Sequence, residues 1–192
     1  KVTFSWRATS DNAVFVAKTG ADSNPGTLAL PVATLAKGIA QAAQLGKRDV
    51  YVAGGVYAGS VDLAAGVSLY GGYGPGFSAR DTVIYQSAVA AVAAALGPVW
   101  ALRCAGIAGA GAKTRVDGLT LLGANAKGPG ESSYGLLAIG CDDRLQVTYN
   151  QVLAGDGAAG GPGPAGSNGT AGGPGKPGLG AKDIGKPQCA AA

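Results

Sequence analysis

The chain has 192 residues, 35 of them glycine, and a formal net charge of +4. This length allows one domain with a hydrophobic core, or a smaller domain followed by a tail. The 15 basic residues form no run longer than the pair Lys47-Arg48, with no aromatic residues interleaved among them, which argues against a nucleic-acid partner. Histidine is absent, which excludes His-dependent triads, imidazole bases and most zinc sites. Any catalysis therefore depends on carboxylates, Tyr, Lys or Arg.

The sequence also bears on where the protein is found. It contains no run of about 18 apolar residues, so we expect no transmembrane segment. It contains no Met at position 1 or elsewhere, and it is low in charge and rich in Gly, Ala, Ser and Thr. These features favour a secreted or cell-surface protein from which a leader has been removed.

The N-terminal part begins with an extension, residues 1–13, that shows no clear period. A strand is predicted at 14–17, followed by a turn-rich loop. Apolar residues at helical spacing then predict an amphipathic helix over 32–45, with Pro31 in its first turn and Gly46 just after its end. We expect this helix to cover the end of the structure that follows.

Three short β-prone runs between Val50 and Tyr73 are separated by glycine-bearing corners that are too short for a crossover helix. The corners lack the Asn-Gly and Asp-Gly pairs that favour hairpins, and similar runs recur downstream. The pattern predicts an all-β domain over residues 14–155, a right-handed parallel β-helix of about three to four coils with an N-terminal capping helix.

The later runs align with one another between coils. One predicted sheet contains 61–63, 99–104 and 135–141, and a second contains 67–72, 116–123 and 145–153. In this register Trp100, Leu102 and Cys104 stack on Leu137, Ile139 and Cys141 of the next coil. Cys104 and Cys141 are then candidates for a disulfide bond, and a buried apolar stack is the alternative.

A more specific resemblance comes from the residues around the helix. The GADSNPGT loop at 20–27, the helix led by Pro31 and Thr34, and the runs DVYVAGGVYAGSV and GVSLYGGY resemble the N-terminal part of the pectate-lyase-like right-handed parallel β-helix superfamily. They are most similar to uncharacterised secreted bacterial members with a GxDxNPGT opening. The resemblance covers residue 14 to about residue 155 and implies the fold. It implies no single activity, because the superfamily includes lyases, hydrolases, adhesins and structural proteins.

From residue 157 the composition changes. Glycine occurs at every third position, at Gly157, Gly160, Gly163, Gly166, Gly169, Gly172, Gly175 and Gly178. With proline between the glycines, the period predicts a collagen-like or polyglycine-II-like segment of polyproline II type over 156–180. A flexible low-complexity tail is the alternative. Residues 181–192 form a short C-terminal tail in which Cys189 is predicted to be a free thiol or an intermolecular crosslink.

The local charged cluster is Asp142-Asp143-Arg144, directly after a predicted strand. The resemblance implies that acidic residues at strand ends bind calcium or act as acid and nucleophile, and that an Arg removes a proton. Asp117 and Asp62 are placed on neighbouring coils. A solvated corner that ends the strand is the alternative interpretation.

Other candidates are weaker. Asp22 and Asn24 offer oxygen ligands for calcium, although an Asx turn explains them equally well. No other cofactor is predicted. The seven tyrosines either pack in the core and corners or stack on sugar rings.

These features together predict a non-catalytic extracellular structural protein. We expect it to self-associate as a fibre, surface-layer or appendage subunit, through the open end of the β-helix and the glycine-rich segment. One alternative is a module that binds or cleaves acidic polysaccharide. Another is the N-terminal fragment of a larger adhesin.

Overall fold

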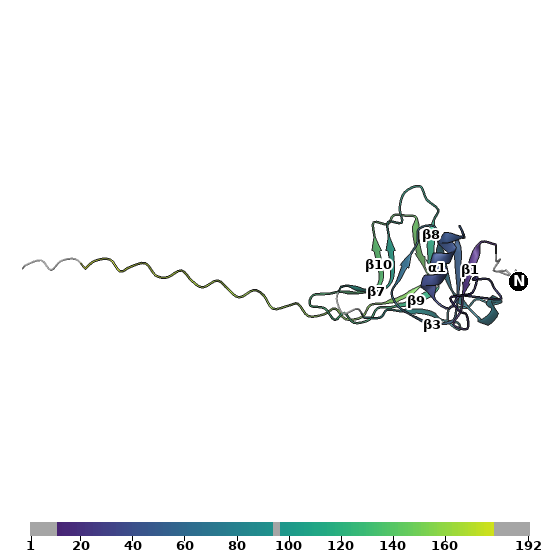
Figure 1. Cartoon of the computed structure of the whole chain (residues 1–192), viewed down its shortest axis with the longest axis horizontal. Coiled ribbons are helices and arrows are strands. Elements are labelled where there is room, and N and C mark those ends of the chain that lie inside the picture. Colours follow the sequence, from purple (N-terminus) through teal and green to yellow (C-terminus); the bar gives the residue numbers. More distant parts are fainter. Residues whose placement is uncertain (1–10, 94–96, 179–192) are drawn as a thin grey trace, which may run out of the picture. The chain divides into compact units, whose positions relative to one another are not determined.

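The computed structural model describes residues 11–93 and 97–178 (Figure 1). The chain divides after Gly161 into two units. Most of the predicted N-terminal extension, and the predicted C-terminal tail with Cys189, lie outside the described residues. Ala13 already belongs to the first strand, one residue earlier than predicted.

The first unit contains three sheets in which all the strand pairs are parallel. Sheet A contains, in spatial order, β1 (Ala13–Val16), β2 (Asp49–Ala53), β5 (Ser68–Tyr73), β8 (Thr114–Asp117) and β11 (Leu145–Thr148). Sheet B contains β3 (Gly55–Ala58), β6 (Ser87–Ala90), β9 (Leu119–Leu122) and β12 (Gln151–Leu153). Sheet C contains β4 (Val61–Leu63), β7 (Val99–Ala105) and β10 (Ser133–Ile139). The chain visits A, B and C in turn and then returns to A, which confirms a parallel β-helix, a β-solenoid of about four turns.

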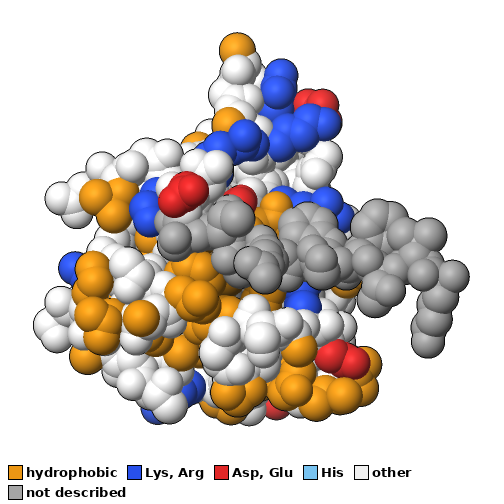
Figure 2. Space-filling model, turned by 90° about the vertical axis from the view of Figure 1, so that its right-hand side faces the viewer, with side chains coloured by type: hydrophobic (Ala, Val, Ile, Leu, Met, Phe, Trp, Pro, Cys, Tyr) orange, Lys and Arg blue, Asp and Glu red, His pale blue; other side chains and the backbone are white. Residues whose placement is uncertain are grey.

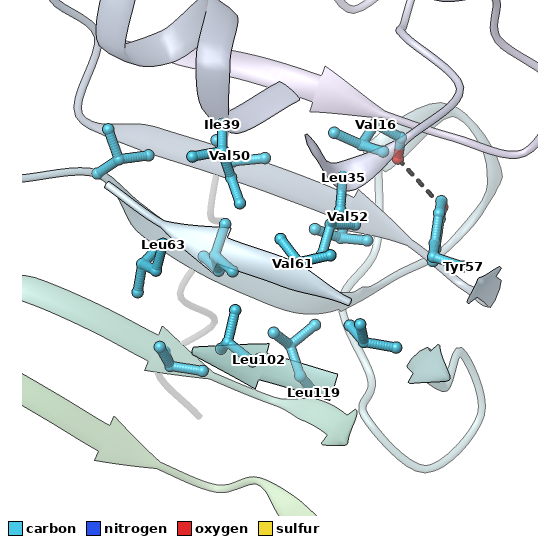
Figure 3. Packing of buried hydrophobic residues seen from close by; sticks show 14 of the residues in the cluster. Val16, Leu35, Ile39, Val50, Val52, Tyr57, Val61, Leu63, Leu102 and Leu119 are labelled. Atoms are coloured by element: carbon cyan, nitrogen blue, oxygen red, sulfur yellow. Dashed lines mark hydrogen bonds between the residues drawn. The ribbon is translucent and has the colours of Figure 1, made fainter. Parts of the chain in front are cut away.

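The core lies between the three sheets and is built from rows of apolar side chains in register. In sheet A one inward row is Val14, Val50, Leu69 and Val116, and all four are completely buried. Figure 3 shows side chains of sheet A packed against those of sheets B and C. Tyr57 enters this core with its hydroxyl donating to the Ala53 carbonyl at 2.9 Å, so its polar atom is satisfied.

The helix α1 (Leu35–Gln44) begins later than predicted. Its N-cap is Thr34, whose side chain accepts a hydrogen bond from the backbone N–H of Lys37. Val32, predicted to be helical, is instead extended and bridges Val16 in parallel. The reason is that Val32 N donates to Phe15 O at 3.0 Å, which pairs part of the free edge of β1.

The helix covers the first coil, as predicted. Leu35, Ile39 and Ala42 are buried in the same core cluster as the strands, and α1 packs on β1, β2 and β4 (Figure 3). The N-terminal end of the solenoid is therefore closed by side chains of α1 and by the extra bridge at Val32.

The alignment of the later strands was partly wrong. The segments 61–63, 99–104 and 135–141 do meet in one sheet, sheet C, but Trp100 faces Tyr134 and Cys104 faces Ala138, a shift of three residues. Strand β10 ends at Ile139, so Cys141 lies beyond it in a turn. The second predicted set divides between two sheets, because the chain turns a corner at Gly118, where φ is 69°.

The second unit is described as far as residue 178. Residues 162–178 have no helix or strand and are exposed. Within the described chain nothing lies within 4 Å of a Cβ placed on the repeat glycines from Gly163 to Gly178. The polyproline II segment therefore stays a prediction from its period.

Gly38 tests how closely α1 packs on the sheet. An added Cβ here would lie 2.5 Å from the Val16 side chain. Although Ala is the better helix former by about 1 kcal/mol, we expect Gly38→Ala to destabilise the protein by about 1–3 kcal/mol through overpacking. Urea denaturation measures this, with Lys37→Ala as the exposed control on the same helix. A Gly38→Ala protein as stable as the wild type would show that the helix does not sit so close to β1.

Candidate functional site

The predicted cluster at Asp142-Asp143-Arg144 forms a turn that is held by hydrogen bonds. One Asp142 carboxylate oxygen accepts from Arg144 N at 2.8 Å and the other accepts from Gly109 N at 2.9 Å. These backbone bonds hold the pKa of Asp142 below its usual range. Asp143 is exposed. Asp117 is at the other end of the sheet A strands, so the structure does not bring these candidates together.

The candidates in the 18–27 loop also have local partners. Asp22 accepts hydrogen bonds from Ala33 N, Thr34 N and the Thr34 hydroxyl, at 2.8–2.9 Å. Asn24 donates to Pro31 O at 2.8 Å. These bonds fix the chain just before α1 and favour the turn interpretation. In residues 11–93 and 97–178, no three His, Cys, Asp or Glu side chains are grouped as a metal site.

Cys104 and Cys141 are free thiols in the structure. The Cys141 thiol lies 3.4 Å from the backbone oxygen of Cys104, and Cys104 is buried in the core. Burial raises the pKa of Cys104 to about 12, so this thiol stays protonated and unreactive at neutral pH. The two thiols are therefore not bonded to each other, and Cys104 stacks on Ala138 in place of Cys141.

The C-terminal end of the solenoid exposes part of its core. Val147 and Val152 continue the inward rows of Val116 and Leu121. Val116 and Leu121 are fully buried, whereas Val147 is 42% exposed and Val152 is 48% exposed. The coil of β11 and β12 covers Val116 and Leu121, whereas no further coil within the described residues covers Val147 and Val152. We call this surface, formed by β10, β11 and β12, the open end.

The open end also presents backbone edges. Each of β10, β11 and β12 is the last strand of its sheet and pairs on one side only. After β12, residues 156–159 run beside the 126–131 loop, for example with Gly130 N donating to Ala159 O at 2.9 Å. Unpaired parallel edges next to exposed apolar side chains readily pair with further β-structure.

A second feature is a groove of about 690 Å³ on the outer face of sheet A, which we call the tyrosine groove. Its lining residues are Asp49, Tyr51, Tyr70, Tyr73, Arg80, Asp81, Thr82, Arg115, Asp117 and Tyr149. The floor is an outward row in register, in which Tyr51 faces Tyr70 and Tyr70 faces Asp117. Because side chains alternate between faces along a strand, the same register that builds the core places these groups together outside.

One wall of the groove is the segment that follows β5. Phe77 of this segment packs against Phe15, with 4.9 Å between the ring centroids, in a small second core on the outer face of sheet A. Arg80 extends from the wall, donates to Gly71 O at 2.8 Å and lies over the rings of Tyr70 and Tyr73. The wall is thus fixed to the sheet by the packing of Phe77 and by the contacts of the Arg80 guanidinium group.

Asp117 is the electrostatic centre of the groove and is only 4% exposed. It forms ion pairs with Arg80 and with Arg115, the latter at 3.2 Å, and accepts a hydrogen bond from the Thr148 hydroxyl. Burial opposes ionisation of Asp117, but the bonds from Thr148 and Arg80 and the charges of both arginines outweigh it. The pKa of Asp117 is therefore lower than that of an ordinary Asp.

Tyr149 forms the far edge of the groove. It occupies the corner that Gly118 occupies one coil earlier, and its φ is 55°. A non-glycine residue in this left-handed region costs on the order of 1–3 kcal/mol. Its ring is nevertheless 83% exposed, so burial of the ring does not offset that cost. An exposed aromatic held in strained backbone at the edge of a groove is a reason to consider Tyr149 as a candidate binding residue.

The groove offers hydrogen bonds and aromatic surface. Burial raises the pKa of Tyr73 to about 12 and also raises that of Tyr70, so both hydroxyls are protonated donors at neutral pH. Asp49 has a pKa raised by burial. The sequence named Asp117 and the tyrosines separately, and it missed Arg80 and Arg115. The signal that could have found them is the two-residue alternation in the sheet A strands. Compared between neighbouring coils, it places the outward-facing residues of these strands next to one another.

Comparisons of the chain with protein-family models, curated proteins and solved structures find no match. The helix that the structure describes is too short to cross a membrane. Figure 2 shows one face of the molecule, on which most Lys and Arg side chains gather in the upper part of the view, with carboxylates near them, and hydrophobic side chains cover much of the lower part.

Removing the carboxylate of Asp117 should cost far more than removing an exposed one. Asp117→Asn leaves Arg80 and Arg115 facing each other without their counter-ion, and we expect a loss of about 2–3 kcal/mol in unfolding free energy. Asp62→Asn breaks the exposed pair with Arg103 and should cost less than about 1 kcal/mol. Urea denaturation at neutral pH compares the two variants, and equal losses would contradict a central role for Asp117.

The contribution of Asp117 should also depend on pH. Because its pKa in the folded protein is below the unfolded value of about 3.9, its contribution is complete above that value and is lost as pH falls through the folded pKa. We expect the stability difference between wild type and Asp117→Asn to narrow from about pH 5 to about pH 2. A difference that stays constant over this range would show that Asp117 is not ionised in the fold.

Proposed function

We propose that the protein is a non-catalytic extracellular structural subunit that self-associates through the open end of its solenoid. The observation that carries this proposal is the contrast in burial between equivalent positions. Val116 is 0% exposed and Val147, next in the same row, is 42% exposed. A second copy of the chain presents the same surface, with unpaired strand edges beside half-exposed valines. The open ends of two copies can therefore cover each other.

The positions of the carboxylates predicted for catalysis or calcium binding support a structural role. Asp142 accepts backbone hydrogen bonds on both oxygens, and Asp22 is bonded to the residues before α1. Asp117 is buried and paired with two arginines. These three carboxylates hold the chain in place, and Asp143 is exposed to solvent, whereas an enzyme would need such groups directed at a substrate.

The closed N-terminal end limits how copies can add. Since α1 covers the core at the first coil and Val32 pairs with part of β1, the described residues leave only the short edges of β3 and β4 at the start of the solenoid for the open end of another copy. Two open ends facing each other give a two-fold contact that closes at a dimer. A fibre, surface layer or appendage therefore requires a second kind of contact.

Two finer statements belong to the same proposal. The GADSNPGT loop, the capping helix and the parallel fold support membership of the pectate-lyase-like superfamily and export from a bacterial cell. Binding of acidic polysaccharide in the tyrosine groove is less well supported. The two arginines of the groove face three carboxylates, so its charge does not favour a polyanion.

The test introduces charge at the open end. We expect the wild-type protein to form dimers or larger species at about 50 μM, measured by light scattering on a size-exclusion column. The double variant Val147→Lys/Val152→Lys should weaken association at least about 100-fold, because two charges would be buried in each half of the contact.

The control is Val83→Lys, which alters a valine that is 79% exposed and is in the segment after β5. It should associate like the wild type, and circular dichroism should show the same fold in all three proteins. Wild-type protein that remains monomeric at high concentration would disprove the proposal.

A further inference from the structure

We propose that the tyrosine groove binds the Pro174–Pro177 segment, PGKP, of a second copy of this chain. The inference rests on the proposed self-association for its setting, but on different residues from the open end. It supplies the second contact that the closed N-terminal end makes necessary.

The segment has the chemistry that such a groove recognises. Residues 174–177 read Pro-Gly-Lys-Pro, a PxxP pattern within the glycine-every-third-residue period. A PxxP segment favours polyproline II, in which carbonyl groups are free to accept hydrogen bonds and little conformational entropy remains to be lost on binding. Residues 162–178 are exposed, so the segment is accessible.

The groove offers the matching partners. Aromatic surface for proline rings comes from the exposed Tyr149 and the half-buried Tyr70. Hydrogen-bond donors for the free carbonyls come from the tyrosine hydroxyls and from Arg115, whose side chain remains partly exposed. Aromatic-lined grooves with donors at their edges are the general mode of polyproline II recognition.

The charges are also complementary. The groove contains the carboxylates Asp49, Asp81 and Asp117 and the guanidinium groups Arg80 and Arg115, a net charge of one negative unit. Lys176 is the only charged residue in 157–178. Asp49, which lies at the groove away from the Asp117 ion pairs, is suited to accept Lys176.

The dimensions agree. The lining residues come from β2, β5 and β8 and from the corner after β11, so the groove crosses three strand spacings, about 14 Å. Four residues in polyproline II span about 12 Å. An unbent segment of this length therefore covers most of the distance from Tyr51 to Tyr149.

The assembly that follows is open. Groove and segment are different surfaces, so a copy that inserts its segment into a neighbour still presents its own groove to a third copy. Such a head-to-tail contact propagates and does not close at two. Together with pairing at the open end, it produces a fibre or layer.

The first experiment measures binding of a synthetic peptide. The probe is residues 171–178, AGGPGKPG, with blocked ends, titrated into isotope-labelled full-length protein and followed by NMR. The protein carries Val147→Lys/Val152→Lys to prevent open-end association and Pro174→Ala/Pro177→Ala to remove its own segment. We expect saturable shifts in the groove, and Tyr149→Ala should weaken binding at least about ten-fold.

Tyr134→Ala is the matched control, because Tyr134 is on sheet C, outside the groove. It should bind within about two-fold of its parent. A peptide with both prolines replaced by alanine should bind at least about ten-fold more weakly. Absence of binding, or binding that Tyr149→Ala does not change, would overturn the inference. So would binding of a neutral oligosaccharide, maltohexaose, at Tyr149 in place of the peptide.

The second experiment tests whether the contact joins two copies. With the open end blocked, one chain carries Tyr149→Ala and keeps its segment, and the other carries Pro174→Ala/Pro177→Ala and keeps its groove. Each alone should be monomeric, and the mixture should form a one-to-one complex by light scattering. A mixture that stays monomeric although the peptide binds would overturn the role of a second copy. Because the open end is blocked throughout, failure here is distinct from failure of the proposed function.

Discussion

In-register stacking of parallel strands is the constraint on which the rest of this structure depends. Each residue of a strand lies beside the equivalent residue of the next coil. Equivalent side chains therefore form rows that run across the sheet. The inward row from Val14 to Val116 becomes the core, and the outward row through Tyr51 and Tyr70 becomes the floor of a groove. The same strand pairing in sheet A therefore builds the core on its inner face and the candidate site on its outer face.

The ends of a stacked structure differ from its middle, and this protein treats its two ends differently. At the start, α1 and the bridge at Val32 replace the missing coil. At the other end, Val147 and Val152 hold core positions without cover. The fold thus has a direction, with its core covered at the first coil and partly exposed at the last. That asymmetry follows from where the helix lies in the sequence.

Much of the fold could be predicted because its signals are local. The runs between Val50 and Tyr73 showed glycine corners too short for a helix, and they form strands β2 to β5. Contacts between coils were harder, since the intervening loops differ in length. With the 123–132 loop before β10, Cys104 pairs with Ala138 and not with Cys141 as predicted. The groove depends on the same distant register, which is why Arg80 and Tyr149 could not be assigned from sequence alone.

The corner at Tyr149 links these points. Gly118 adopts the left-handed backbone of this corner without strain, whereas the next coil uses a tyrosine there and tolerates the cost. Asn150, the next residue, bonds Val116 O and Leu119 N and so holds the corner closed. Hydrogen bonds to the preceding coil thus hold the strained backbone at Tyr149. This is the last corner of the solenoid in the described residues. Tyr149 thus lies at the groove edge, in the corner between β11 and β12.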